Sequence, residues 1–243
     1  MNIERPQFFG LLAGLFLAAG LVLAAMVVTR AWIHIQESSV ISVTGSAQKD
    51  VDSDLIIWHG GFQVEDSTLI KAQEKWAQDL AKVESFLKQR AITNYVLDSV
   101  LASEVKAQPS REGGELKTVG YSLSQNIEFS STNAAEVAAL GRDSVLLVRE
   151  GVLFTSRNPD FIYTKMAREK VSMLAEATRD AKTRADQISS QGGRSLGPLR
   201  SARMGVFQIT PRHSTETSSE GVNDLTSNEK TIRAVVSATF SLK

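Results

Sequence analysis

The chain has 243 residues, with 27 Lys and Arg against 27 Asp and Glu, so its formal net charge is zero. This balance excludes the positive excess by which a protein binds nucleic acid or a polybasic patch binds a membrane surface. The chain has no cysteine, which excludes a disulfide framework and thiol chemistry and is compatible with export.

The first element is an apolar run over residues 8–29 that contains no charged residue, Asn, Gln or Pro. A helix of this length is roughly 33 Å long, enough to cross the hydrocarbon core of a bilayer. Arg30 and Trp32 follow it, where basic and aromatic side chains lie at a membrane interface. We therefore expect a transmembrane signal anchor over residues 8–29, with residues 30–39 as a neck. The local charges are nearly balanced across it and favour residues 1–7 as a cytoplasmic tail only slightly.

We expect membrane lipid to surround this anchor. Gly10, Gly14 and Ala18 form a line of small residues that would let two such helices approach closely. The anchor residues we single out are Phe8, Gly10, Gly14, Ala18 and Val28. A cleaved signal peptide is the alternative, with a small-residue site at residues 22–24 and a released periplasmic protein as its product.

Beyond the neck, β-branched alternation predicts strands over residues 40–48 and 55–64, joined by a turn over residues 49–54. The glycine pair at residues 60–61 indicates a bulge or a close backbone approach in the second strand.

The apolar period then changes to three and four residues, which predicts a helix over residues 67–91. A hairpin of strands over residues 95–106 and 119–130 follows, and then a helix over residues 132–150 and a short strand over residues 152–155. For the first helix we predict the cap Ser67, an apolar face of Leu69, Trp76, Leu80, Val83 and Leu87, and a polar face that includes Asp79.

A third helix is predicted over residues 165–190, ended by the glycine pair at residues 192–193. A long strand over residues 196–210, a mobile loop over residues 211–228 and a last strand over residues 229–242 complete the chain. The narrow stripe of the third helix, expected to pack on a sheet, comprises Ala167, Val171, Leu174, Thr178, Ala181, Ala185 and Ile188. This order predicts an α+β fold: a transmembrane helix, then a mixed or antiparallel sheet with three helices.

Three groups of residues are of types that can carry chemistry. Asp50, Asp52 and Asp54 lack the glycine and glutamate of a calcium loop and are predicted to form a solvated turn. The glycines over residues 192–197 follow a helix, so they are predicted to stop it rather than to hold phosphate. His34, His59 and His213 show no metal-ligand spacing, so no metal, cofactor or catalytic residue is expected.

Three arginines are spaced along the turn and strand that follow the third helix. They could contact an anion or another copy of the chain, although a solvated strand face is the simpler explanation and the one we favour. They are Arg194, Arg200 and Arg203.

Three segments together form a recognisable pattern: residues 43–58 (VTGSA, then VDSDLIIW), residues 120–125 (GYSLSQ), and residues 175–209, an alanine-rich helix, a glycine turn and GVFQI. In these segments the chain resembles the SIMPL-domain family, a domain of unknown function, in its anchored bacterial branch. The resemblance implies a domain over residues 40–243 that is exported to the periplasm, self-associates, and has no established catalytic residue. Ser53 and Met204 depart from the usual Ala and Gln.

The sequence therefore predicts a non-enzymatic, single-pass protein of the bacterial inner membrane whose periplasmic domain binds or self-assembles. The resemblance further implies a role in envelope or oxidative stress. The partners expected are lipid and a second copy of the chain, with no nucleic acid and no protein partner that can be named. The alternatives are an envelope hydrolase whose site forms only in the fold, and a secreted periplasmic protein.

Overall fold

The computed structural model describes residues 5–36, 39–107 and 117–243. The chain divides into two compact units, each discontinuous in sequence. Unit 1 is Met1–Ala47, Leu174–Gly205 and Val235–Lys243, and unit 2 is Gln48–Met173 and Val206–Ala234.

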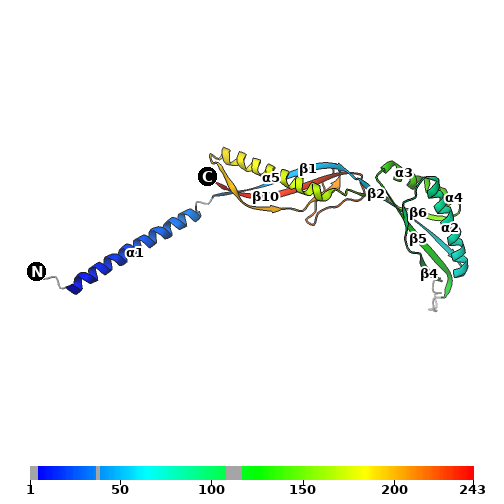
Figure 1. Ribbon diagram of the computed structural model, residues 1–243, viewed down its shortest axis with the longest axis horizontal. Coiled ribbons are helices and arrows are strands. Elements are labelled where there is room, and N and C mark those ends of the chain that lie inside the picture. Colours follow the sequence, from blue (N-terminus) through cyan, green and yellow to red (C-terminus); the bar gives the residue numbers. More distant parts are fainter. Residues whose placement is uncertain (1–4, 37–38, 108–116) are drawn as a thin grey trace. The chain divides into compact units, whose positions relative to one another are not determined.

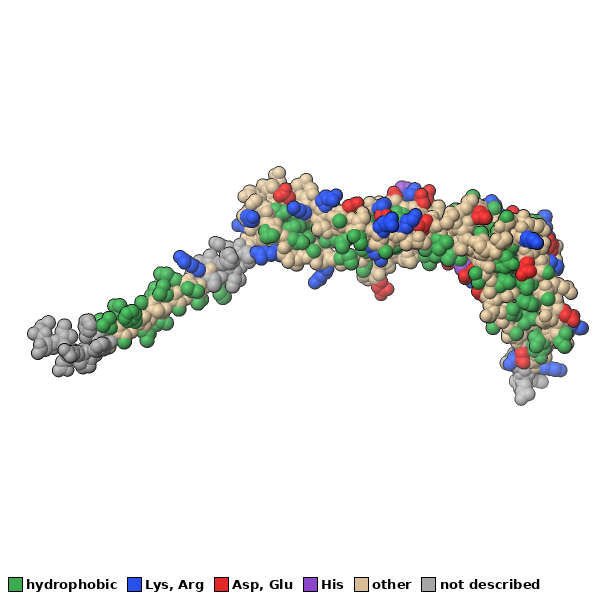
Figure 2. Space-filling view, in the orientation of Figure 1, with side chains coloured by type: hydrophobic (Ala, Val, Ile, Leu, Met, Phe, Trp, Pro, Cys, Tyr) green, Lys and Arg blue, Asp and Glu red, His purple; other side chains and the backbone are tan. Residues whose placement is uncertain are grey.

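The N-terminal helix α1 (Arg5–Gln36) contains the whole apolar run and continues through most of the predicted neck. Its segment Gly10–Arg30 has a mean hydropathy of 2.7 and none of it is buried by other residues. Figure 2 shows hydrophobic side chains over the described surface of this helix, with basic groups at its end. The helix is long and apolar enough to span a membrane or to act as a signal sequence.

In unit 1, strand β10 (Glu229–Leu242) lies between β1 (Val40–Asp52) and β8 (Leu196–Met204). β8 runs antiparallel to β10. Helix α5 (Met166–Gln191) lies along β1 and β10 (Figure 1). The apolar contact between this helix and the sheet comprises Ala181, Ala185, Ala238 and Phe240, flanked by Ile41, Val43 and Leu196.

Helix α5 and β1 approach each other backbone to backbone at Gly45. A Cβ atom at Gly45 would overlap the carbonyl oxygen of Ala177 and lie 2.7 Å from the Cα of Ala181. Ala181 and Ala185 are both fully buried, as predicted. Only small side chains fit in this contact, because the two backbones themselves form its walls.

The buried residues of α5 recur at every fourth position: Met173, Ala177, Ala181, Ala185 and Ser189. The predicted stripe of mixed four- and three-residue steps is therefore wrong at its ends, where Val171 and Ile188 are 72% and 56% exposed. Residues spaced by four form a row inclined to the helix axis, so the contact surface runs obliquely along α5.

Unit 2 contains a second sheet, whose strands pair antiparallel in the order β3, β5, β2, β6; β4 also pairs with β5, and β7 with β2. The strands are β2 (Leu55–Asp66), β3 (Tyr95–Leu97), β4 (Leu101–Lys106), β5 (Thr118–Ser131), β6 (Leu153–Ser156) and β7 (Asp160–Ile162). The predicted hairpin is confirmed, with its first strand split into β3 and β4. Its turn at residues 108–115 lies outside the described residues.

Helices α2 (Leu69–Gln89) and α3 (Ala134–Asp143) cover one face of this sheet, and α4 (Val145–Arg149) follows α3 directly. Together α3 and α4 fill the predicted second helix, so the domain has the three helices expected. The large side chains of the core include Trp58, Phe62, Phe86, Leu87, Ile127, Phe129, Leu140, Leu147 and Phe154.

The start and the face of α2 differ from the prediction. Thr68, not Ser67, caps the helix, because its hydroxyl accepts the amide of Lys71. Leu69 is 48% exposed, while Asp79, assigned to the polar face, is 3% exposed and pairs with Lys82 at 2.8 Å. This ion pair lets a carboxylate occupy an apolar face, which periodicity alone does not predict.

Two predicted strand boundaries are also wrong. The strand over residues 196–210 is broken into β8 and β9 (Gln208–Pro211), and β9 pairs antiparallel with residues 230–233 of β10. β1 continues to Asp52, so the turn predicted over residues 49–54 shrinks to Ser53 and Asp54. The last strand, residues 229–242, has the predicted bounds.

Candidate functional site

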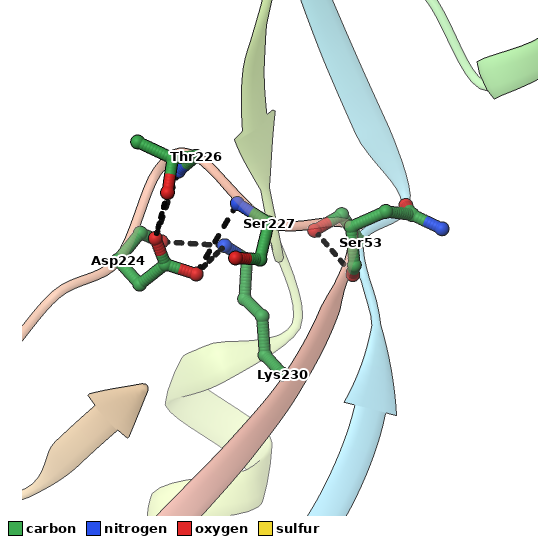
Figure 3. Close-up of polar contacts among 6 residues, drawn as sticks. Ser53, Asp224, Thr226, Ser227 and Lys230 are labelled. Atoms are coloured by element: carbon green, nitrogen blue, oxygen red, sulfur yellow. Dashed lines mark hydrogen bonds and ion pairs between the residues drawn. The ribbon is translucent and has the colours of Figure 1, made fainter. Parts of the chain in front are cut away.

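A buried ion pair closes the loop between β9 and β10 (Figure 3). Lys230 Nζ lies 3.2 Å from Asp224 Oδ2, and these side chains are 1% and 7% exposed. Burial opposes ionisation of Asp224, yet hydrogen bonds from the hydroxyl and amide of Thr226, together with Lys230, hold its pKa below the ordinary 3.8. Nearby, the hydroxyl of Ser53 donates to the carbonyl of Asn228 at 3.1 Å. The loop predicted to be mobile is thus tied to the sheet here, and the cluster has a structural role.

Each carboxylate of the aspartate run over residues 50–54 has a partner, but the Asp50 and Asp52 side chains are 49% and 67% exposed and so remain solvated. The turn itself is limited to Ser53 and Asp54. The partners are the Thr231 hydroxyl for Asp50 at 2.7 Å, Arg212 for Asp52 at 3.2 Å, and the Thr164 amide for Asp54 at 2.7 Å. The Thr164 amide lowers the pKa of Asp54 below its ordinary value. Within the described ranges no group of three or more His, Asp or Glu could hold a metal ion.

His59, on β2, lies between two carboxylates of neighbouring strands. Its Nδ1 lies 3.2 Å from Glu128 Oε1, and its Nε2 lies 3.2 Å from Asp160 Oδ2. A neutral imidazole has one N–H, so it donates to only one of them at a time. Of the other histidines, His213 has a positive φ of 66° in the loop after β9, and the side chain of His34 lies outside the described residues.

The glycine turn after α5 stops the helix, as predicted. Gly193 has φ of 72°, and the amide of Arg194 donates to the carbonyl of Ser189 at 2.9 Å. Arg194, Arg200 and Arg203 are all exposed, and none makes an ion pair with a described residue. Arg194 lies in the turn and the other two on β8, so they do not converge on one point.

Arg203 lies on the face of the unit 1 sheet that α5 leaves uncovered. Two rows of polar side chains cross three strands there: Thr44, Ser237 and Arg203, then Ser42, Thr239 and Ser201. They line a shallow hollow of about 440 Å³. The hydroxyls of Ser42 and Thr239 are hydrogen-bonded to each other at 2.9 Å, so some polar groups of this face bond to one another.

The face of the unit 2 sheet opposite α2 and α3 has a hollow of about 470 Å³. We call it the pit. Its floor is Gly61, which stands between Asn126 of β5 and Thr155 of β6 in the strand register. Its other walls are Phe62, Gln63, Ser124, Leu153 and Arg157.

The glycine pair at residues 60–61 therefore marks close approaches and not a bulge. The pairing of β2 with β5 continues without a register shift through both glycines. A Cβ at Gly60 would lie 2.7 Å from Cζ of Phe154, and one at Gly61 would lie 3.0 Å from Oδ1 of Asn126. Asn126, Thr155 and Arg157 were not predicted as site residues. The only feature of the sequence that pointed to the pit was the glycine pair on β2.

The anchor residues singled out from the sequence all lie on α1. Gly10, Gly14, Ala18 and Val28 are exposed on the helix surface, and beyond the adjoining backbone of α1 no described atom lies within 4 Å of a Cβ placed at either glycine. The side chain of Phe8 lies outside the described residues.

Comparison with curated proteins finds no match. Comparison with protein families finds one that is described as SIMPL, a protein of unknown function (DUF541), and its model matches residues 41–240. That range covers most of the chain and contains both sheets and their helices. The chain therefore belongs to the SIMPL family.

Proposed function

We propose that this protein is anchored by α1 in the bacterial inner membrane and that its periplasmic domain works by binding and self-assembly, not by catalysis. The observation that carries the proposal is that both sheets have helices on one face only. The opposite faces contain the two hollows, which are lined mainly by hydroxyls and amides. Such groups bind by hydrogen bonding rather than exchange protons near neutral pH.

The rival function, a hydrolase, finds its best support in His59 with its two carboxylates. A catalytic base needs one ring nitrogen free to take a proton from a nucleophile or water. Both nitrogens of His59 already lie 3.2 Å from a carboxylate oxygen. This arrangement suits a cross-strand clasp better than a base, and it favours the binding function.

For self-assembly, the two edges of the unit 1 sheet differ in how they are protected. β8 has Pro198, an irregular pairing near residue 200, and the charges of Arg200 and Arg203. These features hinder pairing with another strand. Residues 40–48 of β1 include no charge and no proline, so we propose that copies associate through this edge. The charged residues Glu229, Lys230 and Arg233 lie on β10, a central strand, so they do not guard this edge.

Charge also supports association. In the described part of unit 1 that follows α1, seven Lys and Arg stand against three Asp and Glu, whereas unit 2 has 18 against 22. The zero net charge of the chain thus conceals a basic unit and an acidic unit. Attraction between unlike units of two copies would assist their encounter, and salt would weaken it.

The test of assembly is light scattering on residues 38–243 at micromolar concentration. The amide of Ser46 is bonded to Asp180 instead of to β10, so the amide of Thr44, two residues away, also faces the open edge. We expect an oligomer that Thr44→Pro converts to a folded monomer. Ala202→Pro, placed at the corresponding outward position of β8, is the matched control and should leave the oligomer intact. A monomer mass for the parent across a tenfold dilution would leave only a tethered binding domain.

The test of the anchor is membrane fractionation of the full-length chain. We expect it to stay with membranes after carbonate washing, and a reporter at the C-terminus to be periplasmic. Leu17→Arg should weaken insertion by about 2.5–3.5 kcal/mol. A shortened chain in the soluble periplasmic fraction would instead show signal cleavage.

A further inference from the structure

The pit lies where Gly61 has no side chain, between cross-strand neighbours that do have side chains. On the uncovered face of the unit 2 sheet, three neighbouring strands place Asn126, Gly61 and Thr155 in one row, and Ser124, Gln63 and Leu153 in the next. Adjacent strands lie roughly 4.8 Å apart, so the side chains of the first and third strands are separated by about 10 Å. Glycine at the middle position contributes no side chain to this gap, and the side-chain oxygen of Asn126 reaches to 3.0 Å from the place where a Cβ of Gly61 would lie.

The walls of the pit hold polar groups without partners. In the part of the chain that the structure describes, no hydrogen bond or ion pair uses the side chains of Ser124, Asn126, Thr155 or Arg157. Gln63 donates to Ser122 and Glu65, which leaves its carbonyl oxygen free to accept. The pit therefore offers donors and acceptors for hydroxyl groups on three sides.

Arg157 gives the pit a single charge. It is the only charged residue among the lining residues, and its exposed guanidinium has no carboxylate partner among the described residues. A guanidinium binds a carboxylate through two parallel hydrogen bonds. Leu153, which is 64% exposed, adds one apolar wall against which the carbon face of a ring can pack.

We propose that the pit binds a sugar acid: one ring with several hydroxyls that contact Asn126, Ser124 and Thr155, and one carboxylate that contacts Arg157. This inference deepens the binding half of the proposed function and rests on it. The same chemistry occurs in a free sugar acid and in an acidic residue of a glycan chain. The volume of about 470 Å³ accommodates a mono- or disaccharide.

The test is ligand-observed NMR of the full-length protein in detergent, titrated with D-glucuronate. D-glucose lacks the carboxylate and acetate lacks the ring, so these two probes separate the contributions of charge and hydroxyls. A galacturonate trimer, run in parallel, distinguishes a glycan residue, which should bind more tightly as the trimer, from a free sugar acid. Preference for either source supports the proposal.

Arg157→Gln removes the charge without touching the core, and Arg149→Gln on α4 is the matched control because it is also exposed and unpaired. We expect saturable glucuronate binding that Arg157→Gln weakens by about tenfold or more, while Arg149→Gln leaves it unchanged. Gly61→Leu should abolish binding by filling the pit.

Absence of saturable glucuronate binding, equal binding by Arg157→Gln, or equal affinity for glucose would each overturn the proposal. Thr44→Pro keeps this test separate from that of self-assembly. If the variant is monomeric and still binds glucuronate, the site stands regardless of how the copies associate.

Discussion

The two units both place helices on one face of a sheet, but they fill the space between helix and sheet differently. In unit 1 the contact contains a row of alanines with one ring, Phe240, and at Gly45 backbone meets backbone. In unit 2 it consists of large rings, among them Trp58 and Phe154, stacked with centroids 6.0 Å apart. Helix and sheet therefore lie at two different distances in one chain: a close contact in unit 1 and a wide contact in unit 2. Adding atoms to the close contact destabilises it, and so does removing atoms from the wide contact.

Trp58→Ala should give the largest effect, because it deletes the ring at the centre of the wide contact. Trp58 is 1% exposed, and we expect a loss of about 3–5 kcal/mol in the free energy of unfolding by urea. Ser156→Ala removes only the hydroxyl that accepts the Nε1–H of Trp58, and it should cost about 1 kcal/mol. Equal losses would mean that the hydrogen bond, and not ring volume, holds unit 2.

Asp224→Asn asks whether unit 2 also depends on its buried ion pair. The substitution leaves Lys230, 1% exposed, without its counter-charge, and we expect a loss of about 3 kcal/mol. Lys230→Met should cost less, because Asp224 keeps its bonds from Thr226 and Ser227. A larger loss for Lys230→Met in the same unfolding assay would contradict this account.

The same pair predicts an acid dependence. The pKa of Asp224 is lower in the folded protein than its ordinary 3.8. Its contribution to stability is therefore complete above that value and is lost as the pH falls through the lowered pKa. Between pH 5 and pH 2 the parent should lose more stability than Asp224→Asn, as measured by urea midpoints. Parallel curves for the two proteins would show that Asp224 does not contribute.

Ala181→Leu tests the close contact of unit 1. The added atoms have no space between α5 and β1, and we expect a loss of about 1–3 kcal/mol. Ala175→Leu places the same atoms on an exposed position of the same helix and should change stability by less than about 0.5 kcal/mol. If Ala181→Leu melts with the parent protein, the close contact yields more easily than its geometry indicates.

Val171→Ser should give the smallest effect. Val171 belongs to the stripe predicted from the sequence, yet it is 72% exposed. We expect a change within about 0.5 kcal/mol in the thermal or urea unfolding of the full-length protein. A loss comparable to that of Ala181→Leu would restore the predicted stripe and contradict the four-residue spacing.

Features that depend on neighbouring residues could be predicted from the sequence. An uninterrupted apolar run makes α1 a helix able to span a membrane wherever the rest of the chain lies. The side chain of Asn133 caps α3 by accepting the amides of Ala135 and Glu136, an interaction between near neighbours in the sequence. Alternation gave the last strand its correct bounds. Motifs within residues 43–58, 120–125 and 175–209 carried the family resemblance, and the family match over residues 41–240 confirms it.

Features that join distant residues were decided only by the tertiary structure. Asp79 is buried because α2 packs on the unit 2 sheet, and its partner Lys82 also donates to the distant carbonyl of Glu150 at 3.2 Å. β10 is central because β1 and β8, from opposite ends of the domain sequence, both pair with it. The pit exists because the register of β2 with β5 and β6 sets Asn126 and Thr155 on either side of Gly61. Periodicity tells which side of a strand a residue occupies, but a shift of one residue in pairing would replace every neighbour across the strands.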